Sequence, residues 1–127
     1  MLLDLSDQSS ETLQQQIIRQ VRARILTGEL VAGEALPSIR GMARQLRVSV
    51  ITVDRAYDQL SRQGLISSRR GKGYFVSEVS RKKRTTMARE RLDEQLRHLV
   101  RGAVAEGLSP DDIRRLLEDA LGDSDGD

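Results

Sequence analysis

Two short amphipathic stretches separated by only three residues, 47–49, constrain the fold of this chain more than any other feature. Apolar residues recur on one side of each stretch, as they do on the buried side of an α-helix. These residues are Ile39, Met42, Ala43 and Leu46 in the first stretch and Val53, Ala56, Tyr57 and Leu60 in the second. Ser38 and Ser49 stand where each helix would begin and can cap it, and Gly64 can end the second. Two helices joined by so short a turn predict a helix-turn-helix.

The flanking segments complete a small domain. From Glu11 to Thr27, apolar residues recur every four positions and predict another amphipathic helix, which Gly28 would end. The recurring residues are Leu13, Ile17, Val21 and Ile25. Further on, the runs LISSR (65–69) and YFVS (74–77) flank the turn RGKG and predict a β-hairpin. Three helices and a hairpin over residues 1–78 predict a winged helix-turn-helix domain, so the expected fold class is α+β, mainly α.

The remaining residues, 79–127, predict a two-helix dimerisation segment. The run SRKKRTT contains four consecutive cations at 81–84 that repel one another, so we expect a basic linker and place the domain boundary after residue 78. Beyond it, apolar spacings of four, three and four predict helices with a coiled-coil seam that pairs with a second copy of the chain. The expected interface residues are Leu92, Leu96, Leu99, Val100, Ala103, Ile113, Leu116, Leu117 and Leu121. The acidic end, DSDGD, is expected to be disordered.

Charge is distributed unevenly along the chain. Residues 1–91 contain 17 Lys and Arg against 9 Asp and Glu, whereas residues 92–127 contain 4 against 10. A basic body suits a polyanion such as nucleic acid, although a charged run is often only a solvated surface. The chain has no Cys, no secretion signal at its start and no apolar run long enough to cross a membrane, so the expected compartment is the cytoplasm.

Polar and cationic residues gather where a helix-turn-helix meets duplex DNA. The second helix inserts its N-terminal end into the major groove, and this end carries Ser49, Val50, Thr52 and Arg55. The hydroxyls can bind phosphate, Val50 can contact a thymine methyl, and the arginine can reach a base or the backbone. The alternative is that Ser49 only caps the helix and that Arg55 only pairs with Asp54, Asp58 or solvent.

Two further groups are candidate DNA contacts. Arg40 lies in the first turn of its helix, where a cation opposes the helix dipole, so its position favours a contact with DNA over a role in helix stability. The hairpin tip interleaves cations with glycines that allow a close backbone approach. The tip residues are Arg69, Arg70, Gly71, Lys72 and Gly73. The alternative for the tip is a tight turn with a solubilising lysine.

Catalysis finds little support in the sequence. His98 is the sole histidine, no Cys can act as a nucleophile, and the Gly-Lys pair at the tip lacks the other residues of a phosphate-binding loop. We therefore expect no enzyme, no metal and no cofactor. Of three aromatic residues, Tyr57 and Phe75 are expected in the core, which favours duplex DNA over single strands. A winged helix that contacts protein or RNA remains an alternative.

Three sequence runs point to one family. They are Leu36-Pro37-Ser38-x-Arg40, Thr52-Val53-x-Arg55-Ala56-Tyr57 and Gly71-x-Gly73-x-Phe75-Val76. With them, residues 14–78 closely resemble the DNA-binding domain of the GntR family of bacterial regulators. The short C-terminal segment is similar to the YtrA-type subfamily, in which two helices form the dimer contact in place of an effector domain.

The resemblance implies operator contacts at five positions, which are Arg40, Ser49, Thr52, Gly71 and Gly73. It also implies a homodimeric repressor that binds a pseudo-palindromic operator, with control of a transporter operon and of its own gene. A small-molecule effector is not identified. Two residues depart from the family pattern: Val50 stands where a polar residue or arginine is common, and Arg47 replaces the glycine usual in the turn. Arg47 either adds a phosphate contact or is only a solvated side chain.

Overall fold

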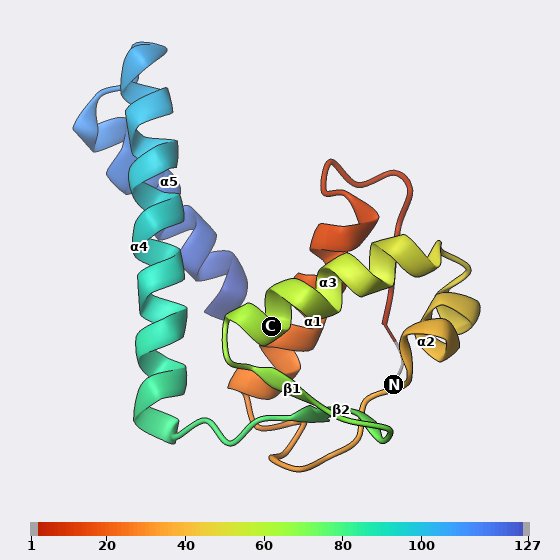
Figure 1. Ribbon diagram of the computed structural model, residues 1–127. Helices are drawn as coiled ribbons and strands as arrows, with labels where there is room; N and C mark the ends of the chain where they lie inside the picture. The colour runs from red at the N-terminus through yellow and green to blue at the C-terminus, as the bar shows by residue number, and fades with distance from the viewer. Residues whose placement is uncertain (1–2, 126–127) are drawn as a thin grey trace. The chain divides into compact units, whose positions relative to one another are not determined.

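The computed structural model describes residues 3–125 and confirms the expected fold class (Figure 1). The elements in chain order are α1 (Leu13–Leu26), α2 (Ile39–Leu46), α3 (Val50–Arg62), β1 (Ile66–Arg69), β2 (Gly73–Val76), α4 (Arg81–Ala105) and α5 (Pro110–Asp125). The chain divides into two compact units, one ending at Thr85 and the other starting at Thr86. The first unit contains the three predicted helices and the antiparallel hairpin. No helix within residues 3–125 is long and apolar enough to cross a membrane.

The helices of the first unit begin at side-chain caps. Ser38 Oγ accepts a hydrogen bond from Gly41 N at 2.9 Å, and Ser49 Oγ accepts one from Thr52 N at 3.0 Å. Both caps were predicted, and each satisfies a backbone N–H that has no partner within its helix. Thr12 caps α1 in a reciprocal arrangement with Gln15. These local bonds fix where α1, α2 and α3 start.

The core of the first unit lies where α1 and α2 pack against α3. The predicted inward faces supply most of its buried residues, and full burial of each large aliphatic side chain stabilises the fold by roughly 1.5–3 kcal/mol. The buried apolar residues are Ile17, Ile18, Val21, Ile25, Leu36, Met42, Ala43, Val53, Ala56, Tyr57, Leu60, Leu65, Ile66 and Val76. Leu13, Ile39 and Leu46 are only half-buried at its edge. Phe75, which we expected in the core, is also half-buried.

The backbone of residues 33–36 pairs with the free edge of β2. Gly33 N donates to Val76 O at 2.8 Å, Val76 N donates to Glu34 O at 2.9 Å, and Leu36 N donates to Tyr74 O at 2.9 Å. The sequence did not predict this ladder. It ties the segment that leads into α2 directly to the hairpin.

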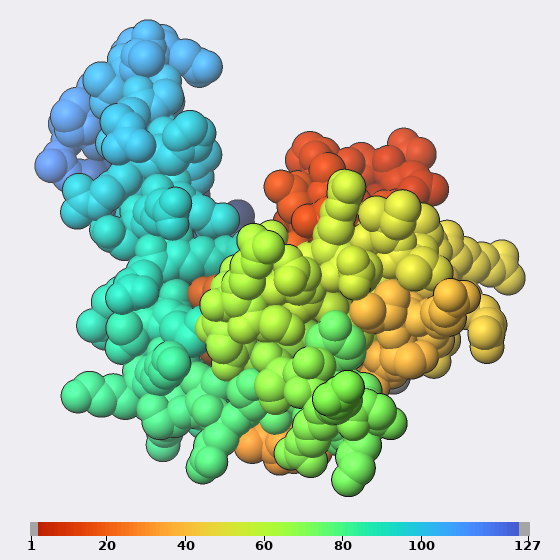
Figure 2. Space-filling view, in the orientation of Figure 1, coloured from red at the N-terminus to blue at the C-terminus, as the bar shows by residue number. Residues whose placement is uncertain are grey.

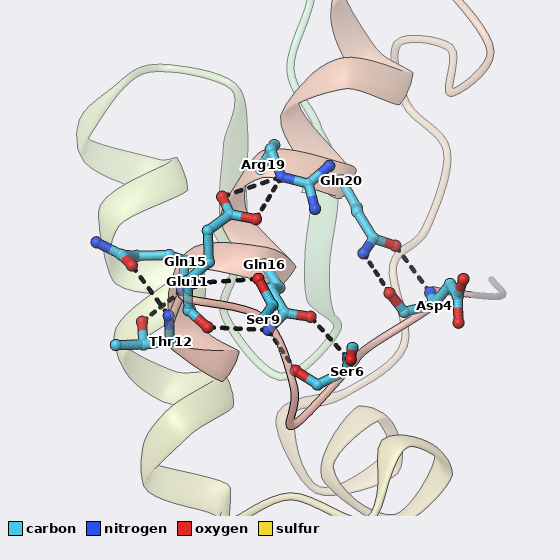
Figure 3. Close-up of polar contacts among 9 residues, drawn as sticks. All are labelled: Asp4, Ser6, Ser9, Glu11, Thr12, Gln15, Gln16, Arg19 and Gln20. Carbon is cyan, nitrogen blue, oxygen red and sulfur yellow. Dashed lines mark hydrogen bonds and ion pairs between the residues drawn. The ribbon is translucent and has the colours of Figure 1, made fainter. Parts of the chain in front are cut away.

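The N-terminal segment is held along α1 by two glutamine side chains one turn apart (Figure 3). Gln16 accepts from Ser6 N and donates to Ser6 O, both at 2.8 Å, and also donates to Glu11 O at 3.0 Å. Gln20 makes the same pair of bonds with the backbone of Asp4, at 2.8 and 2.6 Å. Gln16 is only 2% exposed, so its amide is a buried polar group whose hydrogen bonds offset the cost of its burial.

The C-terminal part of the chain, from residue 79 onward, differs from the sequence prediction in two places. The basic segment expected as a linker is helical, because α4 begins at Arg81 and Ser80 caps it by accepting from Lys83 N at 3.1 Å. The helix α5 continues to Asp125, within the tail for which we expected disorder, while residues 126–127 lie outside the described part. The two helices make few contacts with each other, and none of the described residues of the second unit, from Thr86 on, is buried.

Candidate nucleic-acid interface

The elements that carry the predicted DNA contacts share one face of the first unit. Figure 2 shows α2, the N-terminal end of α3 and the hairpin next to one another on this face. Most of the predicted contact residues are exposed; Thr52 alone is half-buried. Those on the helices and the turn are Arg40, Arg47, Ser49, Val50, Thr52 and Arg55, and those on the hairpin are Arg69, Arg70, Gly71, Lys72 and Gly73. The fold therefore brings three separate parts of the sequence into one surface.

The guanidinium groups of Arg40 and Arg55 project from this surface without a partner in the described part of the chain. Asp58, which the sequence offered as a partner for Arg55, instead forms an ion pair with Arg62 at 3.0 Å. A cation that no neighbouring carboxylate holds can bind a phosphate or a base edge without first breaking an ion pair. Contact of these two arginines with DNA remains a prediction that this exposure supports.

Ser49 and Thr52 form a hydroxyl pair at the start of α3. Their oxygens lie 2.8 Å apart, and Ser49 Oγ also accepts from Thr52 N. One hydroxyl proton is used within the pair, so the other remains available for a DNA oxygen. Capping by Ser49 is thus observed, and it leaves a donor at the end of the helix that would enter the groove. Ile51, which belongs to the same predicted groove-entering end, is exposed as well, although the sequence analysis assigned it no contact.

Arg47 occupies the turn between α2 and α3 in a left-handed conformation, with φ 57° and ψ 46°. It is the one residue other than glycine with positive φ in the described chain. Side chains rarely adopt this conformation because Cβ approaches the following carbonyl oxygen. The glycine that the family pattern favours here has a physical basis, and this chain keeps the turn despite an arginine.

The hairpin tip is a tight turn in which Lys72 N donates to Arg69 O at 2.9 Å. Gly71 and Gly73 have φ values of 74° and 102°, so the turn itself requires glycine at both positions. The Arg69 guanidinium lies over the Phe75 ring, 4.4 Å from its centroid, and this contact restrains the arginine side chain. Lys72 is exposed at the tip of the hairpin, the part of the hairpin that is predicted to contact DNA.

Apolar side chains remain exposed along both helices of the second unit. Leu92, Leu99 and Leu116 are 61%, 66% and 58% exposed. Leu117 and Leu121 are also exposed, whereas Leu96, Val100, Ala103 and Ile113 are half-buried. Val104 and Leu108 add exposed apolar area that the sequence analysis did not assign to the interface. Contiguous exposed apolar area is uncommon on a monomeric protein, and it supports the prediction that these residues form an interface.

A helix-turn-helix with unpaired cations on its exposed face and an adjoining basic hairpin defines a winged-helix DNA-binding protein. The model for bacterial regulatory proteins of the gntR family matches residues 13–76. The chain therefore belongs to the GntR family of DNA-binding transcriptional regulators, a class of regulators and not of enzymes.

Relatives match almost the whole chain. The HTH-type transcriptional repressor YtrA of Bacillus subtilis is 28% identical over 98% of this chain and 96% of its own length. YhcF, an uncharacterised HTH-type transcriptional regulator of the same organism, is 34% identical over 82% of both chains. A solved structure described as a transcriptional antiterminator from Listeria monocytogenes EGD-e is 26% identical, with a TM-score of 0.73 over 95% of this chain and 90% of that one. The YtrA-type resemblance predicted from the sequence is confirmed.

Proposed function

We propose that this regulator is a homodimeric repressor that binds a pseudo-palindromic operator. The exposed apolar face of α4 and α5 carries this proposal. With no buried residue among those described in the second unit, a two-helix hairpin cannot cover its own leucines. A second copy of the chain presents the same face and can bury it in a four-helix cluster.

Dimerisation through α4 and α5 brings two copies of the DNA-contact face, formed by α2, the N-terminal end of α3 and the hairpin, to one duplex. A two-fold dimer recognises two half-sites of opposite direction, which is why the operator is expected to be pseudo-palindromic. Once one half-site is bound, the second surface acts at a high local concentration, and this avidity adds roughly 10²- to 10⁴-fold in affinity. Binding through both DNA-contact faces of the dimer makes the operator complex strong enough to block access to a promoter.

The contacts within each half-site follow from the chemistry of the exposed residues. Arg40 supplies a bidentate contact to guanine or phosphate, and Ser49 with Thr52 donates to phosphate at the end of α3. The hairpin cations bind the backbone or the minor groove beside the recognition helix. By similarity to the repressor YtrA, we propose repression as the outcome, with a transporter operon and the regulator's own gene as targets.

The test separates dimerisation from folding. An operator is first selected from a random duplex pool with the full-length protein. Leu96→Asp with Leu99→Asp should then give a monomer by light scattering and an operator affinity lower by roughly 10²-fold or more. The matched control, His98→Asp with Arg101→Asp, places two carboxylates with the same spacing on the same helix away from the predicted seam, and it should remain dimeric. A dimeric Leu96/Leu99 variant, or one with undiminished affinity, would refute the proposal.

RNA is the second candidate ligand, because one structure of similar fold is described as an antiterminator. The narrow major groove of an RNA duplex does not admit a recognition helix, whereas that of B-DNA does. Parallel titrations with the selected duplex and with an RNA hairpin of equal length decide between them, and tighter binding of the RNA would overturn the DNA proposal.

A further inference from the structure

The Tyr57 side chain connects three parts of the DNA-contact face, which are α3, the hairpin and the segment that enters α2. Tyr57 belongs to α3 and is fully buried. Its hydroxyl donates to the Pro37 carbonyl oxygen at 2.7 Å. Its ring meets that of Tyr74 on β2 edge-on, with 5.0 Å between centroids and 67° between planes. One residue of the recognition helix thus contacts both the hairpin and the segment that enters α2.

Pro37 is the residue at which the chain leaves the ladder with β2 and turns into α2. Leu36, just before it, donates to Tyr74 O, and Ser38, just after it, caps α2. Proline has no N–H, so its carbonyl oxygen is its single backbone hydrogen-bonding group. The bond from Tyr57 is the polar contact that holds this residue against α3.

Core packing accounts for the Tyr57 ring but not for its hydroxyl. A phenylalanine would fill nearly the same volume, and a buried hydroxyl costs free energy unless it is hydrogen-bonded. Burial, with a smaller contribution from Tyr74, raises the pKa of Tyr57 well above its ordinary value. The hydroxyl therefore stays protonated at neutral pH and remains a hydrogen-bond donor.

The position of α2 depends strongly on its two ends because the helix is only eight residues long. Its C-terminal end is set by the left-handed turn at Arg47, and its N-terminal end by Ser38 and Pro37. Arg40 is the second residue of α2, so a rotation of the first turn moves its guanidinium directly. Bidentate recognition tolerates displacements of only about 0.5 Å.

We propose that Tyr57 is a positioning residue for DNA reading, whose hydroxyl fixes Pro37 and so aims Arg40 at the operator. The inference rests on the proposed function, in which Arg40 contacts DNA. Tyr57 itself does not touch the duplex, since it is buried beneath the surface.

The experiment is a double-mutant cycle on the full-length dimer. Tyr57→Phe, Arg40→Ala and the double variant are titrated with the selected operator, with non-operator DNA and with operators substituted at single base pairs. Thr27→Val is the matched control, because it removes a hydroxyl that donates to a backbone carbonyl (Arg24 O, 3.3 Å) at the end of α1. All titrations are made at a temperature where urea unfolding curves show each variant fully folded.

Tyr57→Phe should weaken operator binding by roughly two- to tenfold, the value of one net hydrogen bond, without weakening non-operator binding. It should lose discrimination at the same base pair as Arg40→Ala, and the double variant should bind no worse than Arg40→Ala alone. If the hydroxyl were purely structural, Tyr57→Phe would lower the urea midpoint but would leave operator affinity and base-pair discrimination as they are in the wild type.

Three results would overturn the inference, and they distinguish failure of the proposed contact from failure of the positioning role alone. If Arg40→Ala binds the operator as the wild type does, the proposed contact fails, and the role of Tyr57 fails with it. If Arg40→Ala weakens binding but Tyr57→Phe does not, or if the two losses add in the double variant, only the positioning role is refuted.

Discussion

Replacing Arg47 with glycine tests both the strain of the turn and the contribution of the guanidinium to DNA binding. The residue holds φ at 57°. For a side chain other than glycine the left-handed conformation costs roughly 1–2 kcal/mol. Glycine avoids this cost but loses roughly 0.5–1 kcal/mol to the entropy of the unfolded chain. We therefore expect Arg47→Gly to raise the free energy of unfolding by roughly 0.75 kcal/mol, the difference between the midpoints of the two ranges, which is about 3–6 °C in Tm for a domain of this size.

The two tyrosines provide the assay. Tyr57 and Tyr74 both lie in the first unit, and the chain has no tryptophan, so tyrosine fluorescence follows the unfolding of that unit alone. Arg47→Ala is the control, because alanine removes the charge and keeps the strained φ. It should gain no stability. If alanine and glycine stabilise equally, or if glycine gives no gain, the argument from backbone strain is wrong.

DNA binding by the same variants tests the second half of the prediction. If each Arg47 of a dimer binds one phosphate, both variants should lower the slope of log affinity against log salt by about 0.9 per protomer. We expect this loss in alanine and glycine alike, because it depends on charge and not on φ. An unchanged slope would show that Arg47 is only a solvated side chain.

Three other changes give separate tests. Lys72→Ala should weaken operator and non-operator DNA equally and lower the salt slope by about 0.9 per protomer; loss of discrimination at one base pair would contradict this. Truncation after Glu78 should leave a folded monomer by light scattering and tyrosine fluorescence, with operator affinity lower by orders of magnitude; a dimeric product would refute it. Gln16→Leu should cost about 1–3 kcal/mol in urea unfolding and speed amide exchange at Ser6; unchanged exchange there would contradict the observed role of the glutamine.

Local sequence patterns were enough to predict the helices and the hairpin. The stripe of Ile17, Val21 and Ile25 and the caps at Ser38 and Ser49 depend on residues a few positions apart, so periodicity and cap chemistry reveal them. The ladder of residues 33–36 with β2 is different, because it joins segments about 40 residues apart through backbone atoms that leave no pattern in the side chains.

Where the prediction failed, one physical effect had been given too much weight. Repulsion among the cations at 81–84 predicted a linker that resists packing, but successive helical side chains point in different directions, and the Ser80 cap satisfies the first turn of a helix. The candidate site was predicted as a set of DNA contacts; its residues are exposed except for half-buried Thr52, the elements that carry them share one face, and the contacts themselves remain predictions. The hydrogen bond of the Tyr57 hydroxyl to Pro37 O was not predicted, because packing alone explains an aromatic residue at an inward helix position.

The absence of a buried residue among those described in the second unit links the structure of α4 and α5 to the amount of protein present. Helices that gain their stability from a covering partner become ordered only as that partner becomes available. With a second copy as the partner, the ordered fraction rises steeply around the dissociation constant of the dimer. Below that concentration each monomer would have a folded DNA-contact face but would bind its operator weakly. Operator binding would then depend on the concentration of the regulator itself, which would suit the proposed control of its own gene.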